Sequence, residues 1–258
     1  MSERNEQLQK ITLPKDAWAA LSDEDQYAIS VLGHIFNEVM ILQRLMHAVQ
    51  PRKHRTKVEV SGSVCQVLFL YRLFLAKIFE ANERINKSKE VVAFLKTRCF
   101  PHMPPGEGEA LLKTFRRAAS QCKWLSQARN GHSMHYPAKA ELDGALQHVR
   151  KLKAPFVFIM GSRAGDMLYE TPDQIANLAF CMEAGEGDWK AGMEAVAGDA
   201  NSLADKLNDL IRLSLNAFFE TYQDDRLPSA TRLKVKTAKS FSTPHLADFE
   251  IPYFFDLR

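Results

Sequence analysis

Residues 22–51 read SDEDQYAISVLGHIFNEVMILQRLMHAVQP, and this stretch predicts the fold class. Ser22 is a typical helix N-cap with Asp25 at the third helical position, and acids fill the first turn. The apolar residues that follow recur at steps of three and four, as on one face of a helix: Leu32, Ile35, Phe36, Val39, Leu42, Leu45 and Met46. Pro51 ends the pattern, because proline has no N–H to donate inside a helix. The stretch therefore predicts a long amphipathic helix.

Outside this stretch, the spacing of prolines marks further helical blocks. None occurs between Pro51 and Pro101, between Pro105 and Pro137, or between Pro172 and Pro228. Within these blocks the apolar spacing predicts helices near residues 63–86, 88–98, 107–128, 140–149 and 188–223, and one that begins at 171 and breaks at 185–187. We expect an all-α chain folded as a helical bundle.

Two segments depart from the helical pattern. Residues 156–170, FVFIMGSRAGDMLYE, predict one small inserted β-hairpin with a glycine-bounded turn, the only β structure that we expect. Residues 226–258 predict an extended C-terminal tail, whose apolar end, IPYFFDLR, we expect to dock on the bundle or on a partner subunit. The expected organisation is an N-terminal extension at 1–21, a helical domain at 22–225 and the tail.

The composition is that of an ordinary globular protein: 258 residues, 46% hydrophobic and 25% charged, with a formal net charge of +3. The longest uncharged apolar stretch, Val64–Tyr71, is too short to cross a bilayer, and the N-terminus lacks the apolar core of a secretory signal. We expect a cytoplasmic protein with no membrane partner.

Several classes of site are excluded by the motifs that the chain lacks. The four cysteines form no CxxC pair, so we expect reduced, mostly buried thiols rather than a zinc ribbon or a thioredoxin-type site: Cys65, Cys99, Cys122 and Cys181. No GxxxxGK[ST], GxGxxG or GxSxG occurs in the required context, which excludes the corresponding nucleotide-binding proteins and hydrolases.

The segment with the clearest chemistry is Arg129-Asn130-Gly131-His132-Ser133-Met134-His135-Tyr136, at the end of a predicted helix. Arginine holds a phosphate through two parallel hydrogen bonds, and histidine titrates near neutral pH. RNA cleavage by its own 2′-hydroxyl needs such a pair, one group to move the proton and one cation to stabilise the charge on phosphorus.

The spacing of this pair leaves its geometry open. Arg129 and His135 do not lie on one face of an ideal helix, so either the loop folds His135 back or the pair converges with its copy in a second subunit. In the structural alternative, Arg129 caps the helix C-terminus and His135 makes a buried polar contact.

Arg-Asn, four further residues and His-Tyr at the end of a bundle helix resemble the signature of the HEPN superfamily. The resemblance implies an all-α bundle, frequent homodimerisation and, in many members, metal-independent ribonuclease activity in toxin–antitoxin or antiphage systems. It implies that Arg129, Asn130 and His135 are catalytic, with Tyr136 and His132 in support. Partners would be RNA, a second copy joined beside Arg129–Tyr136, and a protein such as an antitoxin.

Other signals are weaker. His132 and His135 form an HxxH, but no nearby carboxylate or thiol completes a ligand set, so we expect no metal and no cofactor. A basic stretch is either a contact to a nucleic-acid backbone or a solvated loop: Arg52, Lys53, Arg55 and Lys57. Two functions remain open, a HEPN-type endoribonuclease and a non-catalytic dimeric bundle that binds a protein or nucleic acid.

Overall fold

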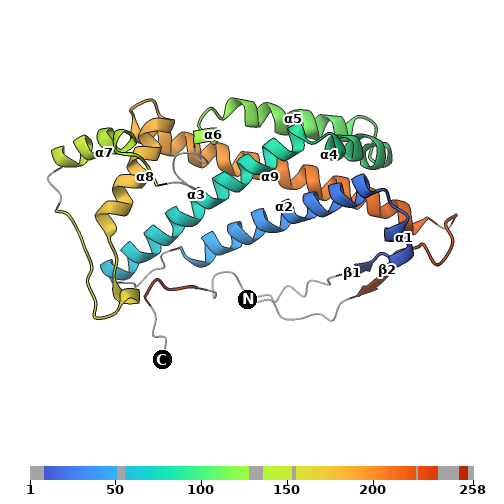
Figure 1. Cartoon of the computed structure of the whole chain (residues 1–258), viewed down its shortest axis with the longest axis horizontal. Helices are drawn as coiled ribbons and strands as arrows, with labels where there is room; N and C mark the ends of the chain where they lie inside the picture. Colours follow the sequence, from blue (N-terminus) through green and yellow to red (C-terminus); the bar gives the residue numbers. More distant parts are fainter. Residues whose placement is uncertain are drawn as a thin grey trace, which may run out of the picture. The chain divides into compact units, whose positions relative to one another are not determined.

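The computed structural model describes residues 9–50, 56–127, 136–152, 155–224, 226–237 and 250–254. Helix dominates, which confirms the predicted all-α class (Figure 1). The elements are β1 (Gln9–Thr12), α1 (Lys15–Ala19), α2 (Asp23–Ala48), α3 (Lys57–Lys87), α4 (Lys89–Phe94), α5 (Glu107–Gln121), α6 (Leu125–Gln127), α7 (Lys139–Lys151), α8 (Glu170–Ala184), α9 (Trp189–Glu220) and β2 (Lys234–Thr237). A π-helical turn, Leu95–Cys99, follows α4.

Side-chain caps set where the helices begin. Ser22 accepts a hydrogen bond of 3.1 Å from the N–H of Asp25, as predicted for the start of α2. The helix expected from residue 63 begins earlier, at Lys57, because Thr56 and Glu59 form a reciprocal capping box. The N–H of Thr56 donates to Glu59 Oε2 at 2.8 Å, and the N–H of Glu59 donates to Thr56 Oγ1 at 3.3 Å.

The breaks between helices are only partly as expected. The helix predicted over 107–128 ends at Gln121 and resumes briefly as α6, because a tight turn at Cys122 interrupts it. The predicted break between α8 and α9 is confirmed. Gly187, at φ +104°, donates its N–H to the carbonyl of Met182 at 2.7 Å, which closes the end of α8.

The expectation that residues 156–170 hold the only β structure is wrong. A two-stranded antiparallel sheet pairs β1 with β2, joining residues from opposite ends of the chain. At the predicted hairpin the two arms approach in antiparallel fashion, but only one bridge forms, between Ile159 and Leu168. Their reciprocal backbone hydrogen bonds measure 2.8 and 2.9 Å.

The chain divides into two compact units. The first contains residues 1–37, 81–117 and 205–248, and the second contains residues 38–80, 118–204 and 249–258. The helices α2, α3, α5 and α9 contribute residues to both. The expected boundaries at 21 and 225 stay a prediction.

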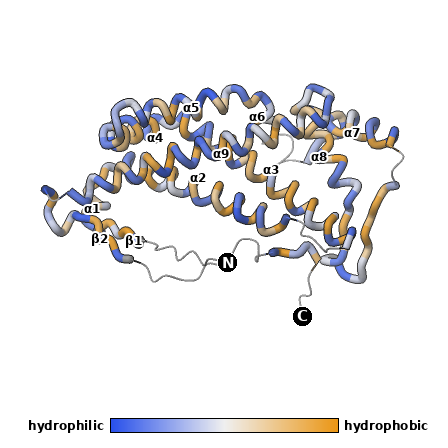
Figure 2. The backbone as a smooth tube through the Cα atoms, turned by 180° about the vertical axis from the view of Figure 1, so that it is seen from behind, coloured by the Kyte–Doolittle hydropathy of each residue, from blue (hydrophilic) through white to orange (hydrophobic). Residues whose placement is uncertain are grey.

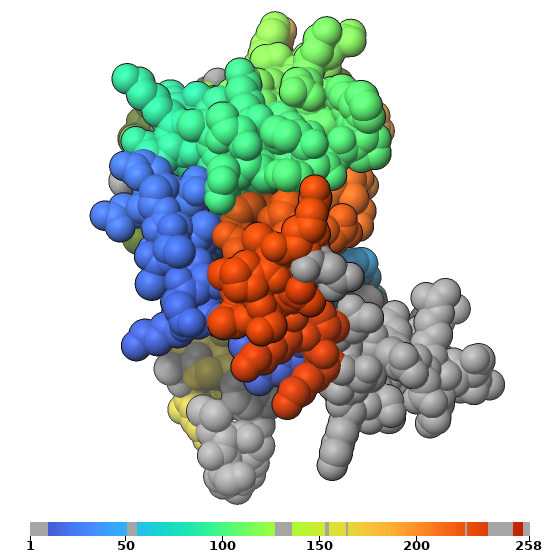
Figure 3. Space-filling model, turned by 90° about the vertical axis from the view of Figure 1, so that its right-hand side faces the viewer, coloured from blue at the N-terminus to red at the C-terminus, as the bar shows by residue number. Residues whose placement is uncertain are grey.

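The core of the first unit joins segments that are distant in sequence. Phe94 of α4 packs against Phe218 of α9 with ring centroids 5.1 Å apart. Arg98 forms an ion pair with Asp25 of α2, with Nε 3.2 Å from Oδ2. Figure 3 shows this face, with the start of α2 in blue beside α4 and α5 in green and the end of α9 in orange-red.

The second unit contains the helix pair α7 and α8 and receives the end of the chain. Ala145 of α7 is buried against Ile175 and Ala179 of α8. The N–H of Ile251 donates to the carbonyl of Ala48 at 2.9 Å, and the hydroxyl of Tyr253 donates to the carbonyl of Met167 at 3.0 Å. Docking of the tail is therefore confirmed for residues 250–254.

Within the described ranges, α3 is the one helix whose length and apolar composition suffice to cross a membrane. This indication is weak, because a core helix of a globular protein passes the same test. Several residues of α3, among them Phe74, Leu75 and Ile78, are fully buried. The expected absence of a membrane-spanning segment stays a prediction.

Candidate functional site

Most of the predicted site lies outside the described residues. This holds for the four candidates Arg129, Asn130, His132 and His135, and equally for the basic residues Arg52, Lys53 and Arg55. Two candidates are described. Tyr136 has a wholly exposed side chain, and Lys57 is exposed at the first position of α3.

The chain that leads into this motif is anchored in the second unit. The indole N–H of Trp124 donates to Asp199 Oδ2 of α9 at 3.0 Å, and the ring lies edge-on to Phe180 of α8 at a centroid distance of 6.4 Å. Trp124 and Leu125 are only 4% and 3% exposed. Trp124, five residues before Arg129, is thus held on α8 and α9.

The chain that leaves the motif is anchored in the same unit. The N–H of Ala138 donates to the Glu141 carboxylate at 2.5 Å, which caps α7. The apolar face of α7 then packs on α8 through Ala145. Both flanks of the Arg129–His135 segment are therefore held on α8, one directly and one through α7.

A pocket of about 290 Å³ opens between α7 and α8. Its lining consists of small or apolar residues with two carboxylates: Glu141, Gly144, Ala145, Ala179, Met182 and Glu183. Because its only charged groups are acidic, this pocket is unsuited to an RNA phosphate.

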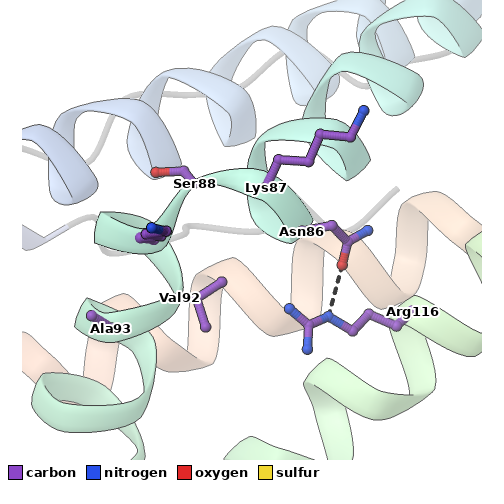
Figure 4. A pocket seen from close by; sticks show the side chains of 7 residues that line it. Asn86, Lys87, Ser88, Val92, Ala93 and Arg116 are labelled. Carbon is purple, nitrogen blue, oxygen red and sulfur yellow. Dashed lines mark hydrogen bonds between the residues drawn. The ribbon is translucent and has the colours of Figure 1, made fainter.

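A second pocket, of about 330 Å³, belongs to the first unit and lies where α3, α4 and α5 meet (Figure 4). It is lined by Asn86, Lys87, Ser88, Lys89, Val92, Ala93 and Arg116. Arg116 Nε donates to Asn86 Oδ1 at 2.7 Å, which ties α5 to the end of α3. Sequence reasoning missed this site, since Arg116 is far along the chain from Lys87 and Lys89, which by themselves are ordinary exposed lysines.

The buried thiols are poor nucleophiles. None of the four cysteines is in a disulfide. Burial, with a smaller contribution from nearby Asp173, raises the pKa of the Cys65 thiol to about 12. Burial also raises the pKa of Cys99 to about 12, assisted by Asp25. Such thiols stay protonated at neutral pH and do not act as thiolate nucleophiles.

Among the residues that the structure describes, no three His, Cys, Asp or Glu side chains lie close enough together to hold a metal ion. His132 and His135 lie outside the described residues. The prediction of a site without metal or cofactor stays a prediction.

The segment that leads into α8 is strongly apolar (Figure 2), and alternate side chains of it form an exposed edge. Phe156, Phe158 and Met160 are 56%, 52% and 62% exposed. Val157 and Ile159 alternate with these residues. Their backbone N–H and C=O groups form hydrogen bonds with Thr171 and Leu168, respectively. This edge differs from an ordinary protein surface, where large apolar side chains are scattered singly.

The chain matches no protein-family model, no curated protein and no solved structure.

Proposed function

We propose that this protein is a metal-independent endoribonuclease of the HEPN type. The observation that carries the proposal is the sequence Arg129-Asn130, four further residues and His135-Tyr136 in a chain that is predominantly helical. The anchoring of both flanks on α8 supports it, because a catalytic segment needs fixed ends to hold its groups in reacting geometry.

In this proposal Arg129 and His135 divide the chemistry. The Arg129 guanidinium binds the scissile phosphate and stabilises the negative charge that develops on its oxygens. His135 moves the proton of the attacking 2′-hydroxyl, and Asn130 supports the pair. The 2′-oxygen bonds to phosphorus as the 5′-oxygen leaves, which gives a 2′,3′-cyclic phosphate and a 5′-hydroxyl. His132 and Tyr136 take supporting roles in this proposal.

The test is incubation of the purified protein with end-labelled RNA in excess chelator. Wild type should cleave, while Arg129→Ala and His135→Ala should lose activity. Arg129→Lys should fail nearly as badly, since an ammonium lacks the planar fork. His132→Ala is the matched control, because it removes another histidine of the same segment. Its loss of activity should be smaller.

Two results would refute this assignment: cleavage that chelator abolishes, or wild-type rates in the Arg129→Ala, His135→Ala double variant. Activity should also change between about pH 5.5 and 8, since the imidazole must change protonation during turnover. The biological setting that we propose is toxin–antitoxin or antiphage defence, with an antitoxin as a protein partner.

The second candidate function is a non-catalytic dimeric bundle, and the exposed edge at 156–160 favours it. The backbone groups of Val157 and Ile159 are used internally. By strand geometry, those of Phe156, Phe158 and Met160 point to the open side of the segment. Such an edge accepts a further extended strand.

The occupant that we propose for this edge is a second copy of the chain. The interface expected beside Arg129–Tyr136 stays a prediction, because residues 129–135 lie outside the described residues. Residues 154–161 contain no charged side chain, so two copies can meet there without repulsion despite the net charge of +3. Tyr169, whose ring packs edge-on to Phe158 at a centroid distance of 6.2 Å, adds an apolar side chain that is 53% exposed. Together with Phe156, Phe158 and Met160, this edge exposes apolar surface on the order of a few hundred Å² per copy, the size of patch that marks protein–protein contacts.

Light scattering at micromolar concentration tests the dimer. Wild type should be dimeric, and Phe158→Glu should shift it to monomer by placing a charge at the centre of the edge. Phe69→Glu is the matched control, because Phe69 of α3 is 51% exposed and lies away from this segment in sequence. A monomeric wild type, or equal effects of the two substitutions, would overturn the dimer.

A further inference from the structure

We propose that the pocket between α3, α4 and α5 binds a phosphate of a single-stranded RNA backbone, held by Arg116. The choice of RNA rests on the proposed function, whereas the phosphate chemistry rests on the pocket itself. Its lining brings together three cations, Lys87, Lys89 and Arg116, and it contains no acid.

Arg116 is oriented before any ligand arrives. Its Nε donates to Asn86 Oδ1 at 2.7 Å, and the amide of Asn86 is fixed in turn by donating to Asn82 Oδ1 at 2.6 Å. This chain of hydrogen bonds occupies Nε and leaves the two terminal nitrogens of the guanidinium for a ligand. Figure 4 shows those nitrogens on the side of Arg116 that faces Val92. A guanidinium held in this way presents parallel donors that match two phosphate oxygens.

The positive charge of the pocket is only partly neutralised by the protein. Lys87 forms an ion pair with Glu83, and Figure 4 shows its side chain pointing away from Arg116. Neither Arg116 nor Lys89 forms an ion pair with any residue that the structure describes. An anion would therefore meet two cations whose charge no carboxylate of the described residues balances at ion-pair distance.

Of the polar groups beside the pocket, Glu90 feels the charge of Lys89 but forms no ion pair with Lys89 or Arg116 among the described residues. The Ser88 hydroxyl donates to Glu90 at 2.7 Å and accepts from the N–H of Val91 at 3.3 Å. The hydrogen bond from Ser88, together with the nearby charges of Lys89 and Arg84, holds the pKa of Glu90 below its usual range. Glu90 thus remains ionised but is directed to Ser88, outside the pocket lining.

The shape of the pocket fits a phosphodiester better than a bare ion. About 330 Å³ exceeds what one phosphate needs, and the wall formed by Val92 and Ala93 is apolar. Sugar carbons flanking the phosphate would contact that wall. A single-stranded backbone provides this combination, because its phosphates and sugars are both accessible.

The experiment measures binding separately from cleavage. A fluorescent 2′-O-methyl oligouridylate lacks the attacking hydroxyl, so anisotropy reports its affinity without turnover. Arg116→Gln should weaken binding about tenfold, as expected for loss of one charged hydrogen-bond pair. It should also reduce the slope of log K against log salt concentration by about 0.7, the value for one phosphate contact on a single strand.

Two further variants separate charge from geometry. Arg116→Lys keeps the charge and should retain the salt slope while it loses most of the affinity. Asn86→Ala removes the acceptor that orients Arg116 and should weaken binding severalfold with the slope unchanged. Both variants keep a positive charge at position 116, so the salt slope should stay the same in each. Weaker binding by Asn86→Ala with an altered salt slope would contradict the positioning role of Asn86.

Arg212→Gln is the matched control. It removes the same charge within the same unit, but Arg212 is already paired with Asp209 at 2.9 Å. An equal loss in Arg116→Gln and Arg212→Gln, or no binding by wild type, would overturn the site. Inorganic phosphate provides a separate probe of the pocket. If Arg116→Gln abolished phosphate binding but left oligonucleotide binding unchanged, RNA would be overturned as the ligand of the pocket. Binding that persists in an inactive Arg129→Ala variant separates this site from the proposed catalysis.

Discussion

Substituting Gly62 by alanine tests how the end of the chain is held. A Cβ at Gly62 of α3 would lie 2.6 Å from Tyr253 Cβ and 2.7 Å from its Cγ. These atoms lie close to the backbone of the tail and cannot rotate away as the tip of a long side chain does. We therefore expect Gly62→Ala to displace Tyr253 from α3.

Two opposing contributions set the change in unfolding free energy that Gly62→Ala should cause. Alanine inside a helix is favoured over glycine by about 0.5–1 kcal/mol. Displacing Tyr253 loses its hydrogen bond to the Met167 carbonyl, about 1 kcal/mol, and the burial of a half-buried ring, also about 1 kcal/mol. The net expectation is a destabilisation of about 1 kcal/mol.

Gly33→Ala is the matched control, because Gly33 lies within α2 and no atom outside that helix would approach its new Cβ within 4 Å. Urea unfolding should show Gly33→Ala more stable than wild type and Gly62→Ala less stable, a difference of about 2 kcal/mol. In a chain that ends at residue 249, Gly62→Ala should become as stabilising as Gly33→Ala. Equal stabilisation by the two substitutions in the full chain would refute the docking of Tyr253.

Three further measurements probe other contacts. Trp124→Phe removes the N–H that bonds Asp199 and leaves a smaller buried ring. Urea unfolding should show a loss of which the hydrogen-bond part, about 1.5–3 kcal/mol, is absent in an Asp199→Ala background, while the loss from the smaller ring persists. Gly192→Ala would place a Cβ 1.8 Å from the Cys181 carbonyl oxygen, and thermal unfolding should show a destabilisation of roughly 2–4 kcal/mol. The pKa of Cys65 is raised from 9.0 to about 12, so its contribution to stability is complete below pH 9 and is lost as the pH rises towards 12. A Cys65→Ala variant should therefore show a smaller decline in unfolding free energy over that range.

The candidate sites differ in how far the sequence could reveal them. Arg129, Asn130 and His135 are recognisable because they are close together in the chain and carry distinctive chemistry. The Asn86–Arg116 pair is not recognisable from the sequence, because the two residues are thirty positions apart and neither belongs to a motif. Only the packing of α5 against the end of α3 gives those residues a common role.

The sequence by itself determined the helical class and most helix positions, because apolar periodicity, proline spacing and the Ser22 cap act over a few residues. It also marked the turn at Gly185–Gly187, where the backbone needs a positive φ. The pairing of β1 with β2 and the contact of Tyr253 with Gly62 were decided by the tertiary structure. Such contacts join distant segments, and the energies that select them come from burial and hydrogen bonding in the folded chain rather than from any local preference.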